Sequence, residues 1–183
     1  MNTILIQSIG IVGAVFGFIA YQCNKHNKIM VFKTVSECIF AVQFALLGAY
    51  TGVAMNILGS TRNLVFSQVV KKNKSTLPYI ILFAVLSVGA VILTWGGPIS
   101  LLAMAGKLCT TVAFGFCKPQ TVRFISFPGS ILWIIYDLIN FSLAGVITEV
   151  FAMISIIFAS ARYFKANAKP KAALSLSHSG RIA

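Results

Sequence analysis

Long apolar stretches dominate this sequence and constrain its fold more than any other feature. A bilayer core takes about 20 apolar residues per helix, and runs of about that length follow one another along the chain. They cover residues of about 4–23, 31–49, 52–70, 77–95, 98–117, 121–139 and 142–163. The second and third runs are separated only by residues 48–52, and one helix across both would be far too long to span once. We therefore expect a tight turn there, and an all-α integral membrane protein with seven transmembrane helices.

The small number of charged residues and their positions are typical of a protein that lies in a lipid bilayer. The chain is 58% hydrophobic and only 10% charged, whereas a soluble domain is about a quarter charged. Its net charge of +12 raises the question of nucleic-acid binding, but such proteins gather Lys and Arg on one solvated face. Here the basic residues form short clusters between the apolar runs, and all three acids (Glu37, Asp137 and Glu149) lie within or at the ends of those runs. The sequence therefore predicts the lipid bilayer as the main partner, and no nucleic acid.

Basic residues also predict the orientation, because Lys and Arg mark the cytoplasmic side of a membrane protein. The second, fourth and sixth connections between runs carry none. The other connections and the tail contain or are flanked by basic residues: Lys25, Lys28 and Lys33; Lys71, Lys72 and Lys74; Lys118 and Arg123; and Arg162, Lys165, Lys169, Lys171 and Arg181. The N-terminus is expected outside and the C-terminus in the cytoplasm. The first run lacks a basic segment before it, which favours a retained helix over a signal peptide.

An internal repeat is visible when the chain is aligned with itself at an offset of about 93 residues. Among the matches are Gly13 with Gly106 and Gly52 with Gly145. The order of helix, basic loop, helix, uncharged turn, helix and basic end is also the same in both copies. We expect a first three-helix repeat over 1–75, a linking transmembrane helix over 76–97, a second three-helix repeat over 98–164, and a disordered basic tail over 165–183. Both copies would enter the membrane in the same direction, as a parallel repeat.

A family resemblance follows from three stretches of the chain. These are Thr61-Arg62-Asn63-Leu64-Val65, Leu132-Trp133-Ile134-Ile135-Tyr136-Asp137, and Glu149 followed thirteen residues later by Arg162-Tyr163-Phe164. In them the chain resembles the YgjV-type family of bacterial inner-membrane proteins, and its three-plus-one-plus-three plan is similar to that of the SWEET and PQ-loop transporters. The resemblance implies a multi-pass protein of the bacterial inner (cytoplasmic) membrane. SWEET repeats carry a proline in the first helix of each unit, which the run 4–23 lacks, so a hinge at such prolines is not expected here.

Ionisable residues at bilayer depth are costly and usually mark function. Glu37 and Arg62 lie at similar distances from the predicted cytoplasmic side, so we expect them to pair. Such a pair is either a structural brace of the first repeat or a charged, gating wall of a solute path. The third alternative is that one of the two side chains extends to the membrane surface instead.

Four further residues match across the repeats: Asn56 with Glu149, and Phe40 with Trp133. A parallel two-fold would bring them together around a central cavity, where amide and carboxylate groups bind hydroxyls and aromatic rings stack on apolar faces. The alternative is that Asn56 caps a helix while the aromatic residues only pack.

Three residues complete the candidate set. Lys107, near mid-depth, needs a carboxylate partner, for which we expect Glu149, and it joins the candidate substrate-binding residues. Asp137 and Tyr136 are expected at the outer mouth, with Asp137 solvated.

The sequence contains no recognisable nucleophile–base pair, phosphate-binding glycine loop or metal-ligand cluster, so we expect no enzyme, no cofactor and no metal. The architecture predicts a transporter that facilitates passage of a small polar solute, sugar-like or another metabolite, between the two repeats. A non-transporting receptor or partner-binding protein on the same bundle is the alternative.

Overall fold

Seven helices make up the computed structural model, which describes residues 3–23, 25–116 and 119–179. Lys118 and Arg181, two of the basic residues used to predict orientation, lie outside the described residues. The helices are α1 (Thr3–Gln22), α2 (His26–Leu47), α3 (Tyr50–Lys71), α4 (Leu77–Leu93), α5 (Ile99–Gly115), α6 (Pro119–Ile139) and α7 (Leu143–Ser179). Their bounds follow the seven apolar runs, with two main differences. The helix α2 begins about five residues before its run, and α7 continues about 16 residues beyond its run.

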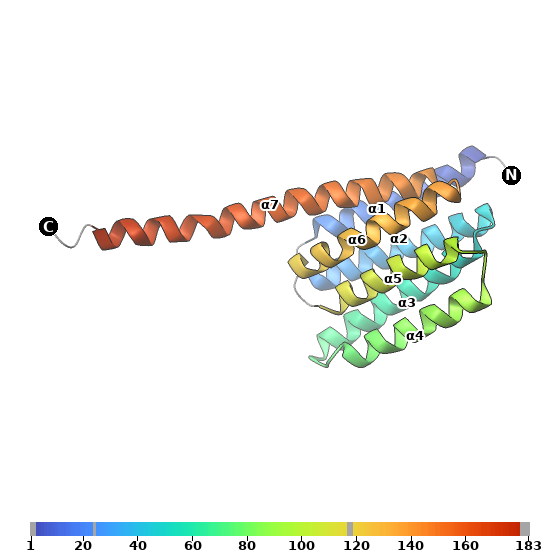
Figure 1. The fold of residues 1–183 in the computed structure, drawn as a ribbon, viewed down its shortest axis with the longest axis horizontal. Coiled ribbons are helices and arrows are strands. Elements are labelled where there is room, and N and C mark those ends of the chain that lie inside the picture. Colours follow the sequence, from blue (N-terminus) through green and yellow to red (C-terminus); the bar gives the residue numbers. More distant parts are fainter. Residues whose placement is uncertain (1–2, 24, 117–118, 180–183) are drawn as a thin grey trace.

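The helices pack as a closed ring with one helix on its outside (Figure 1). Around the ring, α1 packs on α2, α2 on α3, α3 on α5, α5 on α6, α6 on α7, and α7 returns to α1. The remaining helix, α4, lies against α3 and α5. Segments far apart in sequence, such as α1 and α7, therefore lie side by side.

Glycine shapes the shortest connection, the one between α2 and α3. Gly48 has a φ of 75°, in the left-handed region that favours glycine. The amides of Gly48 and Ala49 donate to the carbonyls of Ala45 and Phe44, which is how a left-handed residue ends a helix. The predicted tight turn between the second and third runs is thus present.

Length and composition alone mark three helical segments as able to cross a membrane: Thr3–Gln22, His26–Leu47 and Thr121–Ile139. Leu77–Leu93, Ile99–Gly115 and Leu143–Phe158 are shorter apolar helices. The helix α3 is long enough at 22 residues, but it carries many polar side chains, several of them buried inside the bundle. The sequence predicted seven spans. Length and composition select fewer, because α4 and α5 have only 17 residues each and because α3 carries polar residues that are buried inside the ring.

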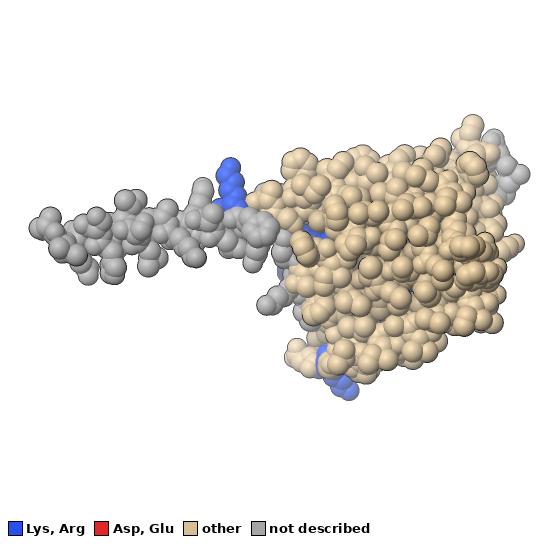
Figure 2. All heavy atoms as spheres, viewed as in Figure 1, with Lys and Arg blue, Asp and Glu red and all other residues tan. Residues whose placement is uncertain are grey.

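The outside of the bundle is apolar. Large hydrophobic side chains such as Leu93, Phe124 and Phe141 are more than two-thirds exposed. Figure 2 shows uncharged side chains over nearly the whole visible bundle, with basic residues only at the end from which α7 extends.

That extension differs from the disordered tail predicted over 165–183. The helix α7 continues through Ser179 and projects beyond the bundle (Figure 1). The segment after Lys165 is rich in Ala, Lys and Leu, which are strong helix formers, and this accounts for the difference.

Candidate functional site

A buried ion cluster lies at the centre of the ring, with Glu37 of α2 as its only acid among the described residues. The Oε1 atom of Glu37 lies 3.3 Å from Arg62 Nη2 of α3 and 3.3 Å from Lys107 Nζ of α5. Asn63 Nδ2 donates to Glu37 Oε2 at 3.3 Å. None of the four residues is more than 4% exposed. The cluster therefore ties α2, α3 and α5 together through two cations on one carboxylate.

All three nitrogen atoms of the Arg62 guanidinium group donate hydrogen bonds within this cluster. Its Nη1 donates to the hydroxyls of Thr110 and Thr111 at 3.1 and 2.9 Å. Its Nε and Nη2 donate to Asn63 Oδ1 at 3.1 and 2.9 Å, and its Cζ lies 4.9 Å from the centre of the Phe114 ring. Such complete pairing is what a charge needs when it is removed from water.

The predicted pairing of Glu37 with Arg62 is confirmed by this geometry, whereas the predicted partner of Lys107 is wrong. Lys107 pairs with Glu37, not with Glu149, because α5 packs directly on α3 and so reaches the cluster. The same ammonium group lies 5.4 Å from the centre of the Trp133 ring, within the range of a cation–π contact.

Gly59 on α3 makes room for this arrangement. A Cβ atom at this position would collide with Glu37 Oε2 and Lys107 Nζ. Only a residue without a side chain allows both charged groups to approach the α3 backbone.

Beside the cluster is a small central cavity of about 30 Å³, enough for one or two water molecules. The structure brings all five candidate substrate-binding residues to its wall. The lining residues are Lys33, Glu37, Phe40, Phe44, Asn56, Lys107, Thr110, Trp133, Asp137, Gly145, Thr148 and Glu149. Every acidic residue of the chain is in this set. Asn56, whose Nδ2 donates to Gly52 O at 2.9 Å, lies within α3 rather than capping its start.

Asp137 is not solvated as the sequence predicted. It is 2% exposed, and its Oδ1 has no hydrogen-bond partner within the described part of the chain. Gly145 of α7 packs directly on the carboxyl group, where a Cβ atom would lie 2.5 Å from Asp137 Cγ. The residue is near the end of α6, but it faces the neighbouring helix instead of the outer water.

Lys33, counted among the basic residues that flank the first connection, also reaches the site. It is 7% exposed and lines the central cavity. Because α2 begins at His26, Lys33 is already about two turns inside the helix. Its ammonium group lies 5.1 Å from the centre of the Tyr21 ring.

An aromatic group separates the central cavity from a second, larger one. The ring of Tyr136 packs against those of Phe44 and Trp133, with centroid distances of 5.7 and 5.5 Å. Phe44 and Trp133 line the central cavity, whereas Tyr136 lines the second. This second cavity has a volume of about 540 Å³ and lies among the α2–α3 and α4–α5 connections, beside Trp95 and Asn140. Tyr136 was predicted at the outer mouth; it is 2% exposed and borders this cavity.

Several residues of the site were not anticipated. They are Lys33, Asn63, Phe44, Gly59 and the threonines of α5. Two of them could have been recognised from the sequence, since Gly59 and Asn63 lie within three residues of Arg62. The described residues contain no group of three His, Cys, Asp or Glu that could hold a metal ion.

Comparison with known proteins accounts for the apolar outside of the bundle. A family model described as "Bacterial inner membrane protein" and named Imp-YgjV matches residues 4–167. The chain belongs to the YgjV family of bacterial inner membrane proteins. It is also 25% identical over 145 residues to "Inner membrane protein YgjV" of Escherichia coli strain K12, which covers 79% of this chain and 76% of that protein. No solved structure matches the chain. The predicted location is thereby confirmed: members of this family are proteins of the bacterial inner membrane, and this one contacts the bilayer through multiple membrane-spanning helices.

Proposed function

We propose that this YgjV-family protein transports a small polar solute across the inner membrane through the central cavity. The observation that carries the proposal is the convergence of all three acids and two lysines on one cavity inside an apolar bundle. Charged side chains at bilayer depth are costly, and they usually mark substrate or ion pathways. We propose no enzymatic role for the site.

The order of helices around the ring supports two parallel repeats. Exchanging α1, α2 and α3 with α5, α6 and α7 converts the contacts α1–α2, α2–α3 and α3–α5 into α5–α6, α6–α7 and α7–α1, all of which occur. The repeat-related pairs Asn56 with Glu149 and Phe40 with Trp133 all line the same cavity. A three-plus-one-plus-three, SWEET-like plan accounts for both observations, with α4 as the linking helix.

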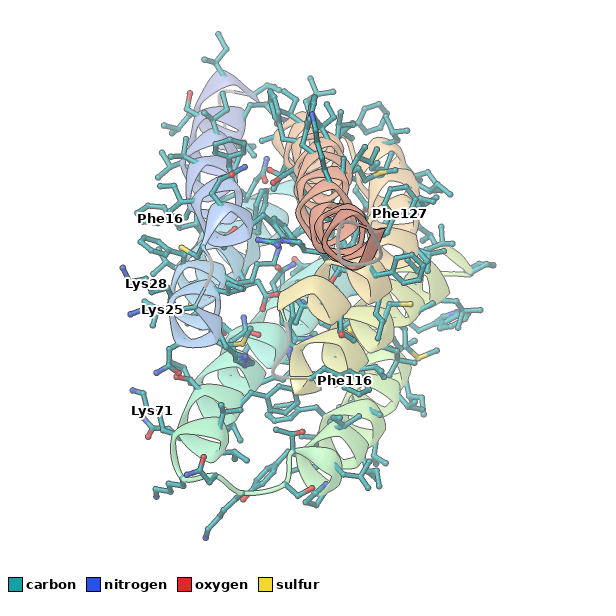
Figure 3. The ribbon with its side chains drawn as sticks, turned by 90° about the vertical axis from the view of Figure 1, so that its left-hand side faces the viewer. Phe16, Lys25, Lys28, Lys71, Phe116 and Phe127 are labelled. Atoms are coloured by element: carbon teal, nitrogen blue, oxygen red, sulfur yellow. The ribbon has the colours of Figure 1, made fainter. Side chains whose placement is uncertain are left out.

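The distribution of basic residues supports an N-terminus outside and a C-terminus inside. Lys25, Lys28 and Lys71 are exposed, and they project from the periphery at the end that carries the α7 extension (Figure 3). The connections at residues 48–49 and 94–98 contain no basic residue. The second cavity, which borders these connections, would then open to the outside.

The structure corresponds to a closed state in this proposal. A site for a small organic molecule measures about 300–1,000 Å³, whereas the central cavity measures about 30 Å³. A sugar-sized solute would enter only after Tyr136, Phe44 and Trp133 separate and join the central cavity to the outer one. Movement of one repeat against the other would supply this opening.

The proposal is tested by thermal stability of the detergent-purified protein against a panel of sugars, nucleosides, amino acids and organic acids. A ligand at about 100 times its dissociation constant stabilises the folded state by about 2.7 kcal/mol. We expect one class of solute to raise the melting temperature, and the effect to be lost in Asn56→Ala and Glu149→Gln. The solute found should then accumulate in vesicles that contain the protein.

Gly89→Ala is a matched control, because a Cβ atom there would meet no atom within 4 Å. This variant should bind and transport as the unaltered protein does. A solute that binds but never crosses would overturn transport in favour of a receptor on the same bundle. No binding across the panel would remove the polar-solute site altogether.

A further inference from the structure

We infer that Asp137 is a proton-binding site, which holds a proton while the central cavity is closed and releases it when the cavity opens to water. This inference rests on the proposed function for its role in transport, because it makes the opening of the cavity dependent on protons. The chemical step is simple: one proton adds to a carboxylate oxygen of Asp137 on closing and leaves to water on opening.

The first observation is the surroundings of the carboxyl group. Asp137 is 2% exposed, its Oδ1 is buried, and no described residue donates a hydrogen bond to that atom. An ionised carboxylate without partners is very costly to bury, and it becomes neutral by taking up a proton. Gly145 covers one side of the group, and the aromatic rings of Trp133 and Tyr136 lie on the same helix one turn and one residue away.

The second observation is that no cation around the cavity forms an ion pair with Asp137 in the described structure, although Lys33 lines the same cavity and its positive charge acts on that carboxyl group. Lys107 of α5 lies 3.3 Å from Glu37 of α2, and Lys33 of α2 lies over the Tyr21 ring at 5.1 Å. Glu149 of α7, which also faces the cavity, carries the same sign as Asp137 and does not favour its ionised form. Asp137 therefore has no ion pair within 4.0 Å among the described residues.

A proton fits this site better than a metal cation does. Sodium needs several oxygen ligands, whereas a proton needs only the carboxylate itself. Although all three acids line the central cavity, the described part of the chain contains no group of three His, Cys, Asp or Glu side chains that could hold one metal ion together. The central cavity, at about 30 Å³, admits water but no larger occupant in this state.

The direction in which pH shifts the cavity between closed and open follows from the charge on Asp137. At low pH Asp137 is protonated, neutral and compatible with a closed cavity. At high pH the group is charged, so the state in which water reaches it is favoured. Acid should therefore close the cavity and alkali should open it.

Infrared difference spectra of the protein in lipid bilayers, taken between acidic and alkaline pH, test the proton site without a known solute. We expect the carbonyl band of a protonated carboxyl group to be present at neutral pH and to disappear in alkali. The band should be lost in Asp137→Asn and kept in Glu149→Gln. A band that survives in Asp137→Asn, or a wild-type protein without such a band at any pH, would overturn the proposal. Displacement of the band by sodium at constant pH would also overturn it, in favour of a sodium site.

The chain provides a second readout, because Trp133 lines the cavity and Trp95 is its only other tryptophan. In a Trp95→Phe background, quenching of Trp133 fluorescence by a water-soluble quencher should increase as the pH rises. Adding Asp137→Asn should abolish this increase and leave Trp133 protected at every pH. A titration of quenching that is unchanged by Asp137→Asn would contradict the link between the proton and opening.

These results are separable from the transport proposal. Failure of every solute to enter vesicles would overturn transport while leaving the infrared band of Asp137 in place. Loss of the proton site would leave uptake intact but independent of pH.

Discussion

At the scale of single residues, the molecule contains charges in two contrasting settings. Glu37 is shared by Arg62 and Lys107 and also accepts a hydrogen bond from Asn63. Asp137, in the wall of the same cavity, has no such partners among the described residues. The first setting is suited to holding helices together, and the second to exchanging a proton.

Glu37→Gln tests the holding role. The substitution keeps the shape of the side chain but leaves two buried cations without their carboxylate. Removing one partner of a buried ion pair costs about 3–5 kcal/mol, and we expect a loss of that size in the free energy of unfolding, measured in mixed detergent micelles. Glu149→Gln is the matched control, because Glu149 has no ion pair within 4.0 Å in the described structure. An equal loss in both variants would contradict a bracing role for Glu37.

Gly59→Ala tests whether the ion cluster needs the space that is left by the absence of a side chain at this position. The new methyl group would displace Glu37 or Lys107, and overpacking of this kind costs about 1–3 kcal/mol. We expect a lower melting temperature than that of Gly89→Ala, where the added methyl group faces open space. Equal melting temperatures would mean that the cluster can move away from α3 at little cost.

At the scale of helices, α5 and α6 approach closely through small residues. A Cβ atom on Gly129 of α6 would lie 3.2 Å from the carbonyl oxygen of Gly106 on α5. A Cβ atom on Gly106 would lie 2.7 Å from Cδ1 of Trp133. Small residues at helix contacts are common in membrane proteins, since they let backbones come together.

Gly106→Ala should therefore move the indole of Trp133 and reduce stability by about 1–3 kcal/mol, as overpacking does. In the Trp95→Phe background, the emission maximum of Trp133 should shift relative to that of the same protein with Gly106 intact. Gly89→Ala in this background should leave the emission unchanged. An unshifted spectrum in Gly106→Ala would show that the α5–α6 contact tolerates a methyl group.

Helix positions could be predicted from sequence because each is encoded by its own apolar run. The Glu37–Arg62 pair was also accessible, since its two residues lie on consecutive helices at similar depth. The partner of Lys107 was not accessible, because it depends on α3 packing beside α5, and no local pattern encodes the order of helices in a ring. Lys33 was counted only as a marker of orientation, because its burial depends on where α2 begins, and α2 begins about five residues before the apolar run. Asp137 was predicted to be solvated because it lies near a helix end. The packing of Gly145 against its carboxyl group cannot be read from the sequence.

At the scale of the whole molecule, the ring encloses charge while its outside is apolar (Figure 2). The exposed basic residues lie at one end, and the large cavity beside Trp95 and Asn140 lies among connections that carry no basic residue. In the orientation proposed above, the cavity beside Trp95 would face the outside of the membrane. Tyr136 and its aromatic neighbours would then lie between that cavity and the central one.

The orientation yields a prediction that depends on neither solute nor proton. In a background with the four native cysteines replaced, Tyr50→Cys places a thiol in the α2–α3 turn, where Tyr50 is 68% exposed. Lys72→Cys places one at the opposite end of α3, also at an exposed position. A membrane-impermeant maleimide should label Tyr50→Cys on intact spheroplasts, because uncharged connections are expected outside, and Lys72→Cys only after the membrane is opened. Labelling of both after opening controls for the reactivity of each thiol. The reverse order of labelling would invert the molecule in the membrane, and the Tyr136 barrier would then face the cytoplasm.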